Sequence, residues 1–152
     1  MKYFLSIIII SFLLSCDDEN TNEQIVNSNS YSVERDTVEV DWVVDGDTFR
    51  FIDEEFGELT VRVLDCDAFE ISDNDRAKQQ AEANNMTVED VIQKGNDALY
   101  WLIDNFKFET VIIVRDPNEN DKDVYNRLLR KVYWNESPYD SLIKARGWDS
   151  GL

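Results

Sequence analysis

The sequence predicts a single α+β domain that is mainly β, and three observations support this. The chain has 152 residues, and 43% of them are hydrophobic, which fits one domain with a modest core. Five segments have the alternating or β-branched pattern typical of strands. Between the third and fourth of them, the apolar spacing changes to that of helices. We therefore expect three strands, a helical segment, two strands and a short final helix.

Three strands joined by short turns open the predicted domain. The first covers Thr37–Val44 and the second Thr48–Ile52, with the turn-favouring pair Asp45-Gly46 between them. A polar turn at residues 53–57 leads to the third strand, Leu59–Leu64. Together they predict a three-stranded meander.

Two helices are predicted next. Asp75–Asn84 forms the first, and Thr87 with Asp90 three residues later marks the start of a longer second helix. Apolar residues recur in the second helix at steps of three and four, so they should form one face packed on the sheet. These residues are Val88, Val91, Ile92, Ala98, Leu99, Leu102, Ile103 and Phe106.

Two strands and a short helix complete the prediction. Thr110–Val114 and Leu128–Trp134 have strand patterns, and Ser137-Pro138 opens a helix that ends near Arg146, before Gly147. This order is the one expected of a five-stranded Greek-key barrel of the OB type. The barrel would carry an amphipathic helix between strands 3 and 4 and a short C-terminal helix.

The N-terminus predicts export. Lys2 precedes the apolar run Phe4–Leu14, which is too short to cross a bilayer but suits a signal peptide. Because Leu13-Leu14-Ser15-Cys16 resembles a bacterial lipobox, residues 1–15 are predicted as a lipoprotein signal peptide, with Cys16 as the lipidated residue. An ordinary secretory signal with a chance cysteine is the alternative. We expect a lipoprotein anchored to a membrane of a bacterial envelope, facing the periplasm or the surface.

A polar tether should separate this anchor from the domain. Residues 16–36 have few apolar side chains, so their composition cannot offset the entropy of ordering. The folded domain is therefore predicted at 37–152. With Cys16 acylated, Cys66 has no disulfide partner and should pack as a small apolar residue, a reactive thiol being the alternative.

Charge and composition limit the possible functions. The chain has 32 acidic and 15 basic side chains, a formal net charge of −17, which disfavours long-range attraction of nucleic acid. A locally basic segment, Tyr125–Trp148, would provide a face for weak, salt-sensitive binding. The sequence has no histidine, which excludes serine–histidine hydrolases, histidine-metal nucleases and most catalytic zinc sites. Carboxylates, arginines and a hard cation remain as the groups that could carry out catalysis.

Carboxylates gather in two short runs. Asp45 and Asp47 would face the same way in extended backbone, although a solvated hairpin turn is the alternative. Asp65, Asp67 and Glu70 follow the third strand. Because clustered carboxylates repel each other, a hard divalent cation with oxygen ligands would resolve the clash. The spacing does not distinguish calcium from magnesium.

One arginine stands in an otherwise apolar strand. Arg62 lies between Val61 and Val63, where an unpaired guanidinium would be costly, so it should face an anion. The partner is either a nearby aspartate or the phosphate of a substrate.

Three separated motifs resemble those of the staphylococcal nuclease (thermonuclease) family, in the same order. They are Asp45-Gly46-Asp47-Thr48, then Arg62 with Asp67 and Glu70, then Asp123-Val124-Tyr125-Asn126-Arg127. The resemblance runs from about Thr37 to Trp148. It implies a calcium-dependent endonuclease that hydrolyses DNA, RNA or both by attack of water on a metal-bound phosphate.

The resemblance also implies a calcium site. Asp47 and Asp67 would be side-chain ligands, the Ala68 backbone carbonyl a further ligand, and Asp45 a supporting residue.

Catalytic roles are implied in the same way. Arg62 and Arg127 would bind the reacting phosphate and stabilise its transition state, while Glu70 would orient or deprotonate water. Tyr125 would contact phosphate or pack under its loop.

The sequence departs from the family in several places. Phe69 replaces a usual proline, and Val124 stands where a basic residue is common. The segment Arg76–Gly95 resembles an insertion that would frame the cleft or merely pack. After Gly147 there is no counterpart of the C-terminal helix of the best-known member, so its base and ribose contacts are not carried over.

Two other functions stay open. A non-catalytic OB-fold lipoprotein that binds nucleic acid or another ligand would suit the negative charge. A purely structural role would make the acids surface groups and Arg62 a core ion pair. We predict no protein partner and expect a monomer whose partners are its nucleic-acid substrate and, through the lipid, the membrane.

Overall fold

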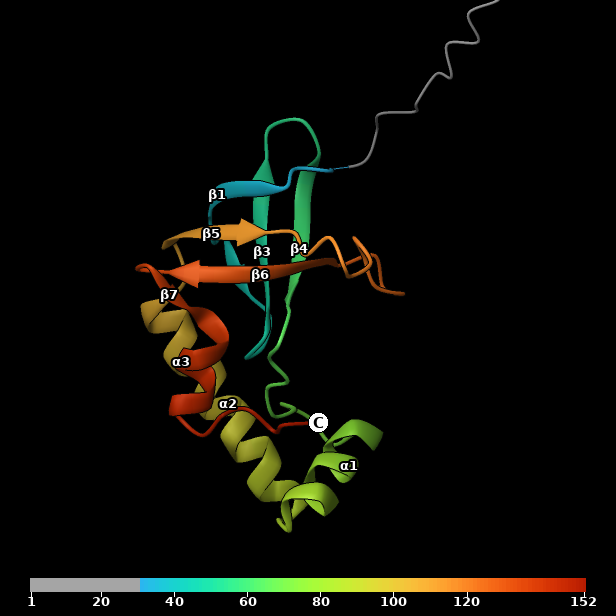
Figure 1. The fold of residues 1–152 in the computed structure, drawn as a ribbon. Helices are drawn as coiled ribbons and strands as arrows, with labels where there is room; N and C mark the ends of the chain where they lie inside the picture. The colour runs from blue at the N-terminus through green and yellow to red at the C-terminus, as the bar shows by residue number, and fades with distance from the viewer. Residues whose placement is uncertain (1–30) are drawn as a thin grey trace, which may run out of the picture.

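The computed structural model describes residues 31–152, so the predicted signal peptide, Cys16 and most of the tether lie outside the described residues. The fold is α+β, as predicted, with seven strands in one mixed sheet and three helices. The sheet occupies one end of the molecule, and the first helix lies farthest from it (Figure 1). Within residues 31–152, no helix has the length and apolar character needed to cross a membrane.

The sheet is antiparallel apart from one parallel pair. Its strand order is β1-β5-β6-β4-β3-β2, with β7 pairing β6 outside this path, and β4 runs parallel to β6. The strands are β1 (Arg35–Glu39), β2 (Trp42–Val43), β3 (Thr48–Asp53), β4 (Gly57–Val63), β5 (Thr110–Val114), β6 (Leu128–Trp134) and β7 (Ser137–Pro138). The predicted meander is confirmed as β2-β3-β4.

The sheet has seven strands rather than the predicted five, and its pairing path is not closed into a barrel. The predicted first strand bends at Val40 and Asp41, whose N–H groups donate to carbonyls on different partner segments. It is therefore two strands, β1 on β5 and β2 on β3. Ser137–Pro138 pairs with β6, which adds β7, and Pro138 is also the N-cap of the last helix, as predicted.

The helices lie close to their predicted positions. The first, α1 (Asp75–Asn84), has the predicted bounds, and α2 (Val88–Asn105) is capped by Thr87, which exchanges hydrogen bonds with Asp90. The last helix, α3 (Tyr139–Ala145), starts after β7. The buried face of α2 includes Val91, Ala98 and Leu102, so its apolar residues belong to the core as predicted.

An aromatic core joins the sheet to the helices. The Phe106 ring at the end of α2 packs against Phe49, Trp134 and Tyr139, with centroid distances of 5.6, 5.3 and 4.9 Å. Tyr31 is also buried and packs on Phe51, so the folded part begins before the predicted boundary at residue 37.

Cys66 is a buried free thiol within this core. Burial raises its pKa, which disfavours the reactive thiolate. The prediction that Cys66 packs as a small apolar residue is confirmed.

Candidate functional site

The predicted site residues in the described part of the chain line a single cleft of about 500 Å³. They come from the turn before β3, from β4 and the loop after it, and from the loop before β6. The lining residues are Asp45, Asp47, Arg62, Asp67, Ala68, Phe69, Glu70, Ile71, Arg76, Tyr125 and Arg127. The structure thus brings together all eight predicted metal, catalytic and substrate-binding positions.

The turn before β3 is buried rather than solvated. A Cβ on Gly46 would lie 2.4 Å from the Ala68 Cβ, so only glycine allows this close approach. The Gly46 carbonyl accepts a hydrogen bond of 2.9 Å from the Tyr139 hydroxyl, and the Asp47 carbonyl accepts one of 2.9 Å from Val63 N–H. Because Asp47 is only 6% exposed, the alternative of a solvated turn is wrong for this residue.

The Asp47 carboxylate is surrounded by donors. Its Oδ2 lies 2.7 Å from Arg62 Nη1 and accepts a 2.7 Å hydrogen bond from Ala68 N–H, while Oδ1 accepts from the Thr48 hydroxyl at 3.0 Å. Burial, reinforced by the charge of Asp45, raises the pKa of Asp47 above the ordinary aspartate range, although Arg62 and Ala68 act in the opposite direction. A buried carboxylate in this setting needs a cation beside it.

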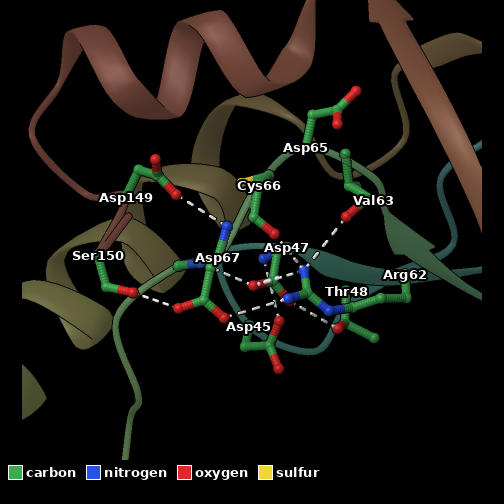
Figure 2. A network of polar contacts seen from close by, with 12 residues as sticks. Asp45, Asp47, Thr48, Arg62, Val63, Asp65, Cys66, Asp67, Asp149 and Ser150 are labelled. Atoms are coloured by element: carbon green, nitrogen blue, oxygen red, sulfur yellow. Dashed lines mark hydrogen bonds and ion pairs between the residues drawn. The ribbon is translucent and has the colours of Figure 1, made fainter. Parts of the chain in front are cut away.

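Arg62 supplies that positive charge by lying between two aspartates (Figure 2). Its Nη1 is 2.7 Å from Asp47, and its Nη2 is 3.4 Å from Asp67 Oδ1. The same guanidinium donates to the carbonyls of Val63 and Cys66, at 3.2 and 2.7 Å. Of the two predicted partners for Arg62, the structure therefore shows aspartate, and both aspartates converge on one cationic group.

Asp67 is held from two sides. Its Oδ1 is 2.9 Å from Arg76 Nη2, while its Oδ2 accepts from Gln80 Nε2 at 3.1 Å and from the Ser150 hydroxyl. The Asp67 N–H donates to Asp149 Oδ1 at 2.8 Å. Helix α1 and the C-terminal segment thus fix a residue that the motif spacing places in the site.

Glu70 lies at the other end of the same loop. Its N–H donates to Gln80 Oε1 at 2.9 Å, and its Oε2 accepts from Asn74 Nδ2 at 2.8 Å. Asn74 is also the N-cap of α1. A Cβ on Gly95 would lie 2.3 Å from the Glu70 carbonyl oxygen, so a glycine in α2 lets the helix approach this backbone closely.

Arg127 reaches the cleft from the loop before β6. Its Nε lies 2.7 Å from Asp123 Oδ2, and its Nη1 donates to the Thr48 hydroxyl at 3.3 Å. Tyr125 is 77% exposed, and its ring centroid lies 5.4 Å from the Arg127 guanidinium carbon. The alternative that Tyr125 packs under its loop is therefore wrong.

The predicted basic face is largely neutralised. Arg130 is fully buried and 2.8 Å from an Asp121 oxygen, and Lys131 and Lys144 lie 2.8 and 3.0 Å from aspartate carboxylates. Of this segment's basic groups, only Arg127 lines the cleft described above.

Sequence reasoning missed several residues that support the site. Arg76 and Gln80 lie in α1, within the segment Arg76–Gly95, and Asn74 caps that helix from just outside the segment. Arg76 lines the cleft, so the start of this segment frames it. Asp149 and Ser150 carry no sequence signal, because their partner Asp67 is far away along the chain.

The donor set suits a hard cation. Asp47 and Asp67 face a shared positive charge, and the Ala68 carbonyl oxygen accepts from the same Gln80 Nε2 as Asp67 Oδ2. Among residues 31–152, no three acidic side chains form a ready-made metal cluster, whereas the implied site has two carboxylate ligands and one carbonyl. Four carboxyl groups and three guanidinium groups line the cleft, so acidic groups outnumber basic groups by one.

Comparison with known proteins assigns no family. No family model matches the chain, and no curated protein matches it.

Proposed function

We propose that the chain is a calcium-dependent endonuclease that hydrolyses DNA, RNA or both, similar in mechanism to thermonucleases. The observation that carries this proposal is the convergence, on one cleft, of two aspartates, two arginines and one glutamate from separate segments. On this proposal the sheet is of the OB type. The β2-β3-β4 meander, the parallel pairing of β4 with β6 and the position of α2 between β4 and β5 all support that assignment.

The cation would be held by Asp47, Asp67 and the Ala68 carbonyl, with Asp45 in support. When bound, calcium would withdraw charge from a phosphate oxygen as a Lewis acid. The Ala68 N–H and the Thr48 hydroxyl would keep the Asp47 carboxylate oriented, since both already donate to it.

The arginines would bind the phosphate. Arg62 is anchored through Nη1 to the Cys66 carbonyl, and Arg127 is oriented through Nε by Asp123, so both planar groups are held before a substrate arrives. Their charges would stabilise the negative charge that grows in the transition state.

Glu70 would direct the attacking water. Its carboxylate is 2.8 Å from the Asn74 side-chain amide, which fixes one oxygen and leaves the other to accept a hydrogen bond from water. We also propose that Cys16 carries the lipid that anchors the exported protein, as the lipobox-like sequence suggests.

A cleavage assay tests the proposal. The chain from Asp17 onward keeps every described residue, and it is incubated with plasmid DNA, single-stranded DNA and RNA, in calcium or in chelator. Glu70→Gln and Arg62→Ala are compared with Glu89→Gln and Arg50→Ala, which make the same changes outside the cleft. Calcium-dependent cleavage lost only in the first pair supports the proposal, whereas absent or calcium-independent cleavage overturns it.

One observation favours the second candidate, a non-catalytic binding lipoprotein. The arginines of the cleft already pair with aspartates, Arg62 with Asp47 and Asp67, and Arg127 with Asp123. Binding of calcium and nucleic acid by the wild-type chain, with no cleavage of any of the three substrates, would identify this function.

A further inference from the structure

A buried amide on α1 is directed entirely at the proposed site. Gln80 is fully buried, and a buried amide is costly unless its polar atoms are bonded. Its Oε1 accepts from Glu70 N–H at 2.9 Å. Its Nε2 lies 3.1 Å from Asp67 Oδ2, 3.0 Å from the Ala68 carbonyl oxygen and 3.2 Å from Ser150 Oγ.

We propose that Gln80 is a positioning residue, which fixes Asp67, Ala68 and Glu70 relative to one another. The inference rests on the proposed function, in which these residues supply two metal ligands and the water-directing carboxylate. One rigid amide then links all three. Hydrogen bonds of this kind orient metal ligands and tune their affinity.

The NH₂ group and the oxygen of the Gln80 amide contact different parts of the site. The NH₂ group holds one oxygen of Asp67, while the other oxygen of that carboxylate faces Arg62 and Arg76. At Ala68, it occupies one lone pair of the carbonyl and leaves the second for a cation. The amide oxygen restrains the backbone of Glu70, so the carboxylate of Glu70 projects from a fixed point.

Helix α1 is held firmly enough to serve as the support. Ala77 and Ala81 are buried against Phe69 and Val91, in a small apolar cluster of their own. Asn84 Nδ2 donates to the carbonyl of Ser150 at 3.1 Å, so the C-terminal segment lies beside α1, as Figure 1 also shows. The position of Gln80 is therefore set by packing rather than by its own hydrogen bonds alone.

The test compares three substitutions in the chain from Asp17 onward. Gln80→Met keeps the length of the side chain but removes its polar atoms. Gln93→Met makes the same change on the exposed side of α2, where the amide donates to Asp97. Ala83→Gly, at an exposed position of α1, weakens the helix without altering the Gln80 amide or the packing of Ala77 and Ala81, so it separates a loss of stability from a loss of positioning.

Three readouts are measured on each protein. Calorimetry gives the calcium affinity, urea unfolding gives the stability, and amide hydrogen exchange without calcium gives the protection of Glu70 N–H. We expect Gln80→Met to lower the calcium affinity by about 10- to 100-fold and to speed exchange at Glu70. Gln93→Met should match the wild type, and Ala83→Gly should lower the urea midpoint while keeping the wild-type affinity.

A second variant covers the case in which Gln80→Met fails to fold. Ser150→Ala removes a small donor to the same Asp67 oxygen that Gln80 holds, and we expect it to weaken calcium binding in the same direction. Wild-type affinity in both Gln80→Met and Ser150→Ala, or an equal loss of affinity in Ala83→Gly, would overturn the role of Gln80. If the wild-type chain binds no calcium, the proposed function fails. In that case hydrogen exchange at Glu70 N–H alone tests the positioning role, and an unchanged exchange rate in Gln80→Met overturns it.

Discussion

Arg62 Nη1 lies 2.7 Å from Asp47 Oδ2, although the two residues come from β4 and from the turn before β3. The contact places an internal cation against a carboxylate that is proposed to bind calcium. Arg62 also faces Asp67, the second proposed ligand. The guanidinium therefore offsets part of the negative charge of the site before calcium is bound, and on the proposed function calcium and Arg62 would contact the same two carboxylates.

Removing this guanidinium should destabilise the calcium-free protein. Arg62→Ala leaves the buried Asp47 carboxylate without its cation, so we expect the free energy of unfolding to fall by about 3 kcal/mol in chelator at a pH above about 8, where Asp47 is ionised. Calcium should restore much of the loss, because it replaces the missing charge. Urea unfolding with and without calcium measures both effects. Arg50→Ala, which breaks an exposed pair with Glu58, should change stability by less than about 1 kcal/mol.

Stability should depend on pH through Asp47. Burial and Asp45 raise its pKa in the folded state, so the folded protein binds this proton more tightly than the unfolded chain does. The resulting stabilisation is present below the ordinary aspartate pKa and is lost as pH rises through the raised pKa. In chelator, Asp47→Asn should therefore gain stability relative to the wild type as pH rises across that window. A difference between the two proteins that does not change with pH would contradict the assignment.

A single substitution of Gly46 should destabilise the protein, because its backbone lies close to Ala68. In Gly46→Ala the new methyl group would lie 2.4 Å from the Ala68 Cβ, so we expect a loss of about 1–3 kcal/mol and weaker calcium binding. Adding Ala68→Gly removes the opposing methyl group and should recover most of both losses. Thermal unfolding and calorimetry on the single and double variants test this. Equal defects in the two variants would show that the clash is not the cause.

A second arginine competes for Asp67. Arg76 Nη2 lies 2.9 Å from Asp67 Oδ1 and is partly exposed, so Arg76→Ala should strengthen calcium binding by about threefold, with little change in stability. Calorimetry on Arg76→Ala and on Lys78→Ala, an exposed cation on the same helix, measures the difference. Weaker calcium binding in Arg76→Ala would contradict the proposed competition.

Local signals were enough to predict most elements. The bounds of α1 and the capping of α2 by Thr87 and Asp90 depend on residues within one helical turn, which the sequence displays directly. The meander was likewise predictable, because its strands are joined by short turns. The bend at Val40 and Asp41 was not, since strand-forming residues stand on both sides of it.

The charged residues of the site could be predicted from the sequence, but the residues that hold them in place could not. Asp47, Arg62, Asp67 and Glu70 stand out as charges beside apolar strands, and the structure brings them to one cleft. Gln80 does not stand out, because a polar residue in a polar helix gives no sign that it is buried. Contacts of the C-terminal segment with Asp67 join residues far apart in the chain, and no local pattern encodes them.

The most direct test is the initial rate of nucleotide release from single-stranded DNA by the chain from Asp17 onward, measured across a calcium titration. We predict that the rate saturates with calcium and disappears in chelator. It should also fall at least about 100-fold in Glu70→Gln, while Glu89→Gln stays at the wild-type rate. Equal rates in the wild type and Glu70→Gln, or no release at saturating calcium, would contradict the proposed function.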